Sequence, residues 1–147
     1  DFCLSRGLGD VYKRQVCRLK TPVTENFADV SENDPNYTAI GIAKAFGVVN
    51  GDEHDCVDPG GSISRQDALT ILDRALAAGG VRVKKATGEE LKHCRDRDRI
   101  SEYAADCVSR MLAQGYVSGL FSGVSFEPEK TLTRAEAACM IYGVLWE

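Results

Sequence analysis

Residues 130–145 show the clearest ordering of polar and apolar positions in the chain. The segment reads KTLTRAEAACMIYGVL, in which polar residues are followed by apolar residues at three- and four-residue steps. This spacing is typical of a helix with one buried face. The expected buried positions are Ala137, Met140, Ile141, Val144 and Leu145. Thr133 and Glu136 stand at the start of the pattern, where each side chain can accept a hydrogen bond from a free backbone N–H. The pattern therefore predicts a capped helix that begins next to Thr133.

The same pattern occurs a second time, earlier in the chain. Ser64 and Asp67 open it, and its apolar positions are Ala68, Ile71, Leu72, Ala75 and Leu76. Arg65 and Arg134 occupy equivalent places just inside the two helix starts, and 134 − 65 = 69, the offset that also relates the apolar positions. Internal repetition at a fixed offset indicates a tandem repeat.

Each capped helix is preceded by another expected helix, at residues 37–46 and 101–114. A pair of glycines follows each of these segments, namely Gly47 with Gly51 and Gly115 with Gly119. Glycine adopts positive φ without strain, so it is suited to ending a helix and turning the chain. Each copy is therefore predicted to be a helix, a glycine turn, a loop with a proline, and a capped helix.

The repeats divide the chain into five segments. Residues 1–15 resemble the translated remnant of a sequencing adaptor, and we exclude them from the fold as non-native. The segments that follow are a linker at 16–26, repeat 1 at 27–80, a charged spacer at 81–92 and repeat 2 at 93–147. The fold class predicted for this organisation is all-α.

Composition narrows the class of partner. The chain carries 22 acidic and 18 basic residues, a net charge of −4, and no run of basic residues, which argues against a nucleic-acid partner. No apolar run approaches the roughly 18–20 residues that a membrane-spanning helix needs, so we expect no membrane span.

Candidate chemistry is sparse. The six cysteines do not have the spacing of a disulfide scaffold, and we interpret them as free thiols, with disulfides as the alternative. Residues 50–61 are acidic, but Asp55 and Gly61 stand where a calcium loop needs Gly and Glu. His54 and His93 lie near cysteines without the spacing of a zinc site. We therefore expect no metal, no cofactor and no catalytic site.

The repeated pattern resembles the S-layer homology repeat. Phe27 and Asp29 open the first copy, Cys94 and Asp96 stand in their places in the second, and each copy has the glycine turn and an apolar-x-Pro segment. The second copy also contains Leu132-Thr133-Arg134-Ala135-Glu136, the most recognisable motif of the family. The resemblance covers residues 27–76 and 94–145.

The resemblance implies a fold and a function. The fold would consist of tandem helix-loop-helix repeats packed as an incomplete pseudo-threefold bundle, because family members use three repeats. The function would be non-covalent anchoring at the bacterial cell surface by binding secondary cell-wall polysaccharide, often through a pyruvylated amino sugar. The chain would then be extracellular, and a third repeat or an effector domain of the same longer chain would be a further partner.

The resemblance also implies ligand-binding residues. Arg134 and Arg65 would contact the carboxylate of the sugar, and Tyr103 stands where many family members carry a sugar-stacking Trp. The other expected site residues are Thr133, Glu136, Ser64, Tyr37, Gly115, Gly119, Gly47 and Gly51.

Three alternatives remain open on the sequence. The arginines can instead be solvated charges or form local ion pairs, with Glu136 or Asp67 as partners. The repeats can serve a structural or protein-binding role without sugar binding. They can also be the accessory anchor of a wall-active enzyme whose catalytic domain lies elsewhere.

Overall fold

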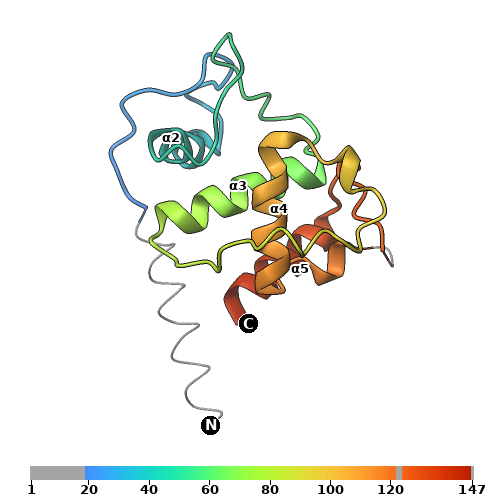
Figure 1. The fold of residues 1–147 in the computed structure, drawn as a ribbon. Coiled ribbons are helices and arrows are strands. Elements are labelled where there is room, and N and C mark those ends of the chain that lie inside the picture. The colour runs from blue at the N-terminus through green and yellow to red at the C-terminus, as the bar shows by residue number, and fades with distance from the viewer. Residues whose placement is uncertain (1–18, 122–123, 147) are drawn as a thin grey trace.

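A computed structural model of the chain is all-α over the residues that it describes, 19–121 and 124–146 (Figure 1). The helices are α2 (Tyr37–Ala45), α3 (Arg65–Ala78), α4 (Glu102–Gln114) and α5 (Arg134–Trp146), with short 3₁₀ helices η1 (Arg97–Arg99) and η2 (Ser118–Leu120). The all-α class is confirmed, and the four α-helices lie close to their expected bounds. The excluded segment 1–15 falls outside the described residues. No described helix has the length and apolar character to cross a bilayer.

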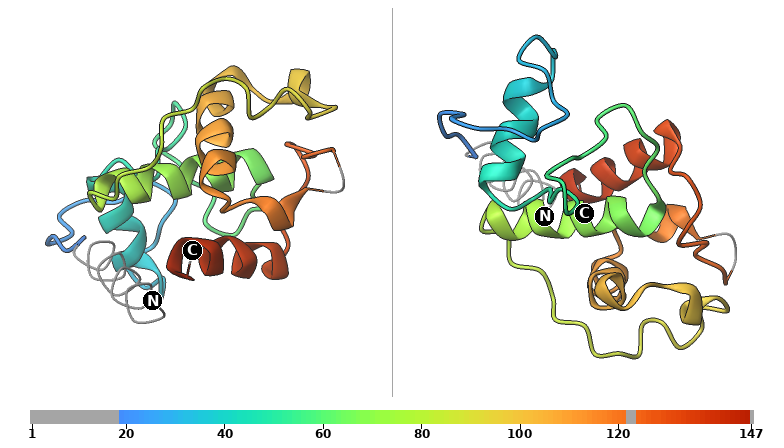
Figure 2. Two further views of the ribbon diagram at one scale, coloured as in Figure 1. Left: turned by 60° about the horizontal axis from the view of Figure 1, so that its bottom comes forward. Right: turned by 90° about the horizontal axis from the view of Figure 1, so that it is seen from above.

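The main contact between helices joins the two repeats. α3, the second helix of repeat 1, packs against α4, the first helix of repeat 2. Figure 2 (right) shows α3 lying between α2 and α4. Leu69 and Leu76 of α3 belong to one apolar cluster with Val108 and Met111 of α4, and all four side chains are at most 1% exposed. Burial of each such side chain stabilises the folded state by roughly 1.5–3 kcal/mol. The apolar core therefore lies at the junction between the repeats.

The apolar faces differ in part from those expected. Leu69 is fully buried although the periodicity did not place it on the inner face. On α5, Met140 and Val144 are buried as expected, but Ile141 is 57% exposed. Phe46, expected to face inward at the end of α2, is 38% exposed. The physical reason is that neither Ile141 nor Phe46 packs against the apolar cluster at the junction of the repeats. The side chain of Leu145 lies outside the described part of the chain.

One aspartate in each repeat fastens the loop that leads to the capped helix. Asp29 and Asp96 each accept hydrogen bonds from two consecutive backbone N–H groups. The donors are Val57 and Asp58 in repeat 1 and Phe126 and Glu127 in repeat 2, at 2.7–3.1 Å. The Val57 N–H is the main reason why the pKa of Asp29 is lowered. The second donor of each pair adopts positive φ, 47° at Asp58 and 54° at Glu127, so the two loops share one conformation.

The helix-start loops of the two repeats also pair with each other. The N–H of Arg65 donates to the carbonyl of Lys130 at 2.9 Å, and the N–H of Leu132 donates to the carbonyl of Ile63 at 3.0 Å. An isolated antiparallel bridge between Ser64 and Thr131 lies at the centre of this contact. The starts of α3 and α5 are therefore held side by side.

Shortening a buried side chain at the junction should destabilise the protein more than shortening an exposed apolar side chain. We expect Leu69→Ala to lower the free energy of unfolding by about 2–5 kcal/mol, because it leaves a cavity between α3 and α4. Ile141→Ala, at an exposed position of α5, should change it by only about 0.5 kcal/mol. Urea unfolding of the two variants measures the difference, and equal losses would contradict a core centred on the junction.

Candidate functional site

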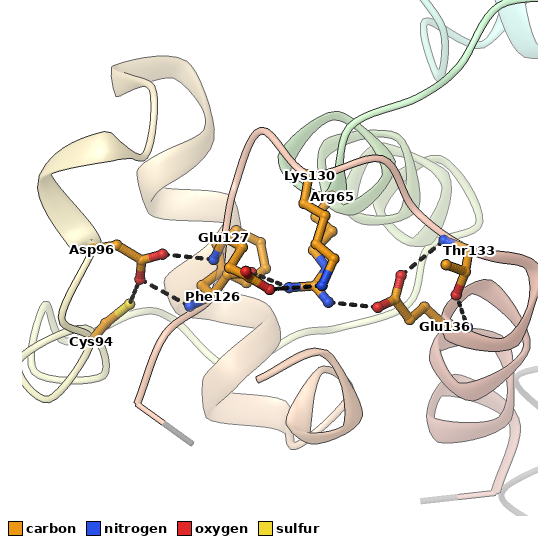
Figure 3. A network of polar contacts seen from close by, with 8 residues as sticks. All are labelled: Arg65, Cys94, Asp96, Phe126, Glu127, Lys130, Thr133 and Glu136. Carbon is orange, nitrogen blue, oxygen red and sulfur yellow. Dashed lines mark hydrogen bonds and ion pairs between the residues drawn. The ribbon is translucent and has the colours of Figure 1, made fainter. Parts of the chain in front are cut away.

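The start of α5 is capped as the sequence predicted. The hydroxyl oxygen of Thr133 accepts a hydrogen bond from the N–H of Glu136 at 3.2 Å. In return, carboxylate Oε2 of Glu136 accepts one from the N–H of Thr133 at 2.8 Å (Figure 3). The two residues satisfy two of the free N–H groups at a helix N-terminus, whose positive end favours a nearby anion.

Arg65 does not lie where a ligand could reach it. It is 3% exposed, and its guanidinium bridges the repeats (Figure 3). Its Nη2 donates to Oε1 of Glu136 at 2.5 Å, and its Nη1 donates to the carbonyl of Phe126 at 2.6 Å and to Oε2 of Glu127 at 3.1 Å. The expectation that Arg65 contacts a sugar carboxylate is therefore corrected, because buried protein oxygens accept hydrogen bonds from both of its terminal nitrogens.

Arg134, the equivalent residue of repeat 2, has the opposite environment. It is exposed at the first position of α5, and within the described part of the chain its side chain makes no hydrogen bond or ion pair. The same motif thus places one guanidinium inside the repeat junction and leaves the other in solvent.

Ser64 and Tyr103 converge on a single carboxylate at the start of α3. Ser64 Oγ accepts from the N–H of Asp67 at 3.2 Å and donates to Asp67 Oδ2 at 2.5 Å. The hydroxyl of Tyr103, on α4, donates to Asp67 Oδ1 at 2.5 Å. Partial burial and this hydrogen bond raise the pKa of Tyr103. Ser64 therefore caps α3 as expected, and Tyr103 is bound to that cap while its side chain stays 58% exposed.

A hollow of about 490 Å³ lies between α5 and the turn that follows α4. Its lining is Gly115, Tyr116, Gly119, Ala138, Cys139, Tyr142 and Gly143. Gly115 has φ 85°, the left-handed conformation expected of a helix-ending glycine. A Cβ at Gly143 would lie 3.2 Å from Cα of Tyr116. The absence of a side chain at Gly143 therefore allows α5 to approach the turn after α4 closely.

The hollow and Arg134 share one side of α5. Residues four apart on a helix lie on the same face, and Arg134, Ala138 and Tyr142 have this spacing. The structure thus brings Gly115 and Gly119 to the helix that carries Arg134. Ala138, Cys139 and Tyr142 were not predicted as site residues, although the four-residue spacing from Arg134 is a signal that indicates Ala138 and Tyr142.

The remaining expected site residues belong to repeat 1, around α2. Tyr37 is half-buried at the start of α2, and its carbonyl accepts from Asn26 Nδ2 at 2.8 Å. Gly47 has φ 64° just after the end of α2. A Cβ at Gly51 would come within 2.9 Å of the Phe27 ring, so this glycine makes room for a core aromatic side chain. These three residues have structural surroundings in repeat 1 rather than beside the hollow on α5.

Two helix-loop-helix repeats that are joined through the contact between α3 and α4 define a tandem-repeat helical module. The profile of the S-layer homology domain matches residues 26–69 and 95–138, one segment in each repeat. The chain therefore belongs to the S-layer homology domain family, as its motifs indicated. This domain is a non-catalytic anchoring domain that binds cell-wall components, which associates the chain with the cell surface.

Two curated proteins are similar to the chain. They are an exoglucanase, XynX, of Acetivibrio thermocellus and an amylopullulanase of Thermoanaerobacterium thermosulfurigenes. Each is 33% identical over 119 residues, which is 81% of this chain. The match spans 11% of the length of the first protein and 6% of the second. No solved structure matches the chain.

The ion pair between Arg65 and Glu136 makes stability depend on pH in a defined window. The Arg65 guanidinium, followed by the Thr133 N–H, lowers the pKa of Glu136 from 4.5 to about 2. A carboxylate with a lowered pKa contributes its full stability above its unfolded pKa and loses it as the pH falls through the folded value. The free energy of unfolding should therefore decrease as the pH is lowered from about 4.5 to about 2.

Other acidic groups titrate in the same window, so the Glu136→Gln variant provides the comparison. The advantage of wild type over this variant, measured by urea unfolding, should shrink across the window. A constant advantage would show that Glu136 is not paired in the folded protein.

Proposed function

We propose that this chain anchors a bacterial surface protein to the cell wall by binding secondary cell-wall polysaccharide through a pyruvylated amino sugar. The observation that carries the proposal is the environment of Arg134, which is exposed at the capped start of α5 and lies on the helix face that lines the hollow. A guanidinium binds a carboxylate with two parallel hydrogen bonds, and the positive end of the helix adds to the attraction.

The other groups of this site suit a carbohydrate. Gly115 and Gly119 present backbone without side chains, so a sugar ring can approach closely. Tyr142 lines the hollow with its side chain 60% exposed and offers an aromatic face to the ring. Thr133 lies beside Arg134 at the mouth of the site. In this proposal Glu136 orients the helix start, and Ser64 and Tyr103 stabilise the junction between the repeats.

A second proposal concerns the longer protein in which such an anchor works. The two similar proteins are named as enzymes that act on glycans, and the chain corresponds to about a tenth or less of their length. This supports an accessory role, in which the repeats hold a wall-active or glycan-degrading enzyme at the cell surface. Further repeats in the longer chain would strengthen anchoring, because linked sites act at a high effective concentration.

Removal of the Arg134 guanidinium should weaken binding of purified wall polymer. Hydrogen bonds to charged groups contribute about 1.5–3 kcal/mol, so Arg134→Ala should weaken binding roughly 10- to 100-fold. Arg134→Lys keeps the charge without the planar pair of donors and should fall in between. Isothermal titration calorimetry, with Arg82→Ala at an exposed position of the spacer as the matched control, measures these effects.

The polymer offers a second control. Mild acid removes ketal-linked pyruvate, and binding to the treated polymer should drop for wild type to the level of Arg134→Ala on the untreated polymer. Equal affinity of wild type and Arg134→Ala for the intact polymer would remove Arg134 from the mechanism.

A further inference from the structure

The asparagines of this chain differ in how easily the backbone can attack their side chains. The four are Asn26, Asn33, Asn36 and Asn50. In this reaction the backbone nitrogen of the next residue attacks the carboxamide carbon Cγ, so the nitrogen must be unhindered and free of hydrogen bonds. Asn50 is followed by Gly51, which has no Cβ beside the attacking nitrogen.

The backbone N–H groups that follow the first three asparagines are all held in hydrogen bonds. The N–H of Phe27 donates to Oδ1 of Asn26 at 2.9 Å. The N–H of Asp34 donates to the carbonyl of Ser31 at 2.9 Å, and that of Tyr37 donates to the carbonyl of Asp34 at 2.9 Å. Each of these nitrogens is thus part of a turn, which has to open before the nitrogen can attack.

The turn at Asn50 leaves both reacting groups free. Asn50 is exposed, and within residues 19–121 and 124–146 neither its side chain nor the N–H of Gly51 makes a hydrogen bond. The equivalent turn of repeat 2 shows that a neighbouring helix does not cover this position. There Val117 is fully buried where α3 packs on α4, yet Gly119, the counterpart of Gly51, is exposed.

We propose that Asn50 is a site of spontaneous deamidation. The nitrogen of Gly51 forms a bond to Cγ of Asn50, and the bond from Cγ to Nδ2 breaks. Nδ2 leaves as ammonia and carries away the proton of the Gly51 N–H, so that a cyclic succinimide remains. Water then opens this ring at one of its two carbonyls, which yields either aspartate or isoaspartate. Water is the only co-reactant.

The isoaspartate product should loosen the packing of Phe27, which is 3% exposed. Gly51 lies against this ring, because a Cβ on it would come within 2.9 Å of Phe27 Cε1 and within 3.1 Å of the carbonyl of Cys56. In isoaspartate the main chain runs through Cβ and Cγ of residue 50, so one extra backbone atom precedes Gly51. The glycine then has to shift relative to Phe27. The aspartate product adds charge but leaves the backbone unchanged.

Peptide mapping by mass spectrometry tests the site. After prolonged incubation of the folded chain, the peptide with Asn50 should gain the mass difference between a carboxamide and a carboxylic acid. Asn50→Gln should abolish this gain, because a longer side chain does not form the five-membered ring. Asn33→Gln, at another exposed asparagine, is the matched control and should leave the gain unchanged.

A parallel sample in guanidinium chloride separates the effect of the turn from that of the sequence. Asn33 and Asn36 should react more slowly in the folded chain than in the unfolded chain, because their turns must open first. Asn50 should react at the same rate in both states to within about threefold, since no hydrogen bond has to open. The proposal is overturned if Asn50 stays intact, or if folding protects it as strongly as Asn33 and Asn36.

The loosening of Phe27 is tested by comparison with a variant of equal charge. Ion exchange separates the deamidated chain, which carries one more negative charge than the intact chain. Its isoaspartate form should unfold at a lower denaturant concentration than the Asn50→Asp variant, which has the same charge and an ordinary backbone. Equal midpoints of the two would show that the extra backbone atom does not disturb the packing of Gly51 on Phe27.

Discussion

The buried guanidinium of Arg65 is the interaction on which the arrangement of the two repeats depends. A charge removed from water is tolerated only when partners of opposite charge or strong acceptors surround it, and here they come from the neighbouring repeat. Its terminal nitrogens donate hydrogen bonds to the carboxylates of Glu136 and Glu127 and to the carbonyl of Phe126. The other oxygen of Glu136 caps α5 through Thr133 (Figure 3). The position of α5, and with it the position of Arg134, is therefore linked to a residue of the first repeat.

The two arginines show how one motif serves two purposes in a repeat array. Each stands at the first position of a capped helix, with the same apolar spacing behind it. Arg65 is followed by another repeat, and its side chain enters the junction. Arg134 has no described repeat after it, and its side chain remains in solvent. What an arginine of this motif does depends on its neighbours in space: Arg65 stabilises the junction because repeat 2 packs against it, whereas Arg134 is exposed among the described residues.

Much of the fold could be predicted from the sequence because the signals are local. Caps such as Thr133 with Glu136, and left-handed glycines such as Gly115, act within a few residues, so the helices were found close to their observed ends. The burial of Arg65 and Leu69 and the exposure of Ile141 could not be predicted from such local signals. Leu69 and Arg65 are buried because repeat 2 packs against them, and Ile141 is exposed because it does not pack against the core cluster. Periodicity identifies an apolar side of a helix but not the partner that covers it.

The most direct test of this account is a double-mutant cycle between Arg65 and Glu136. The free energies of unfolding of wild type, Arg65→Met, Glu136→Gln and the double variant yield the coupling energy between the two side chains. Residues that share an ion pair couple by about 0.5–3 kcal/mol, and the bridging position of Arg65 places this pair in the upper half of that range. Additive losses, within about 0.5 kcal/mol, would show that the two repeats are not joined through this guanidinium.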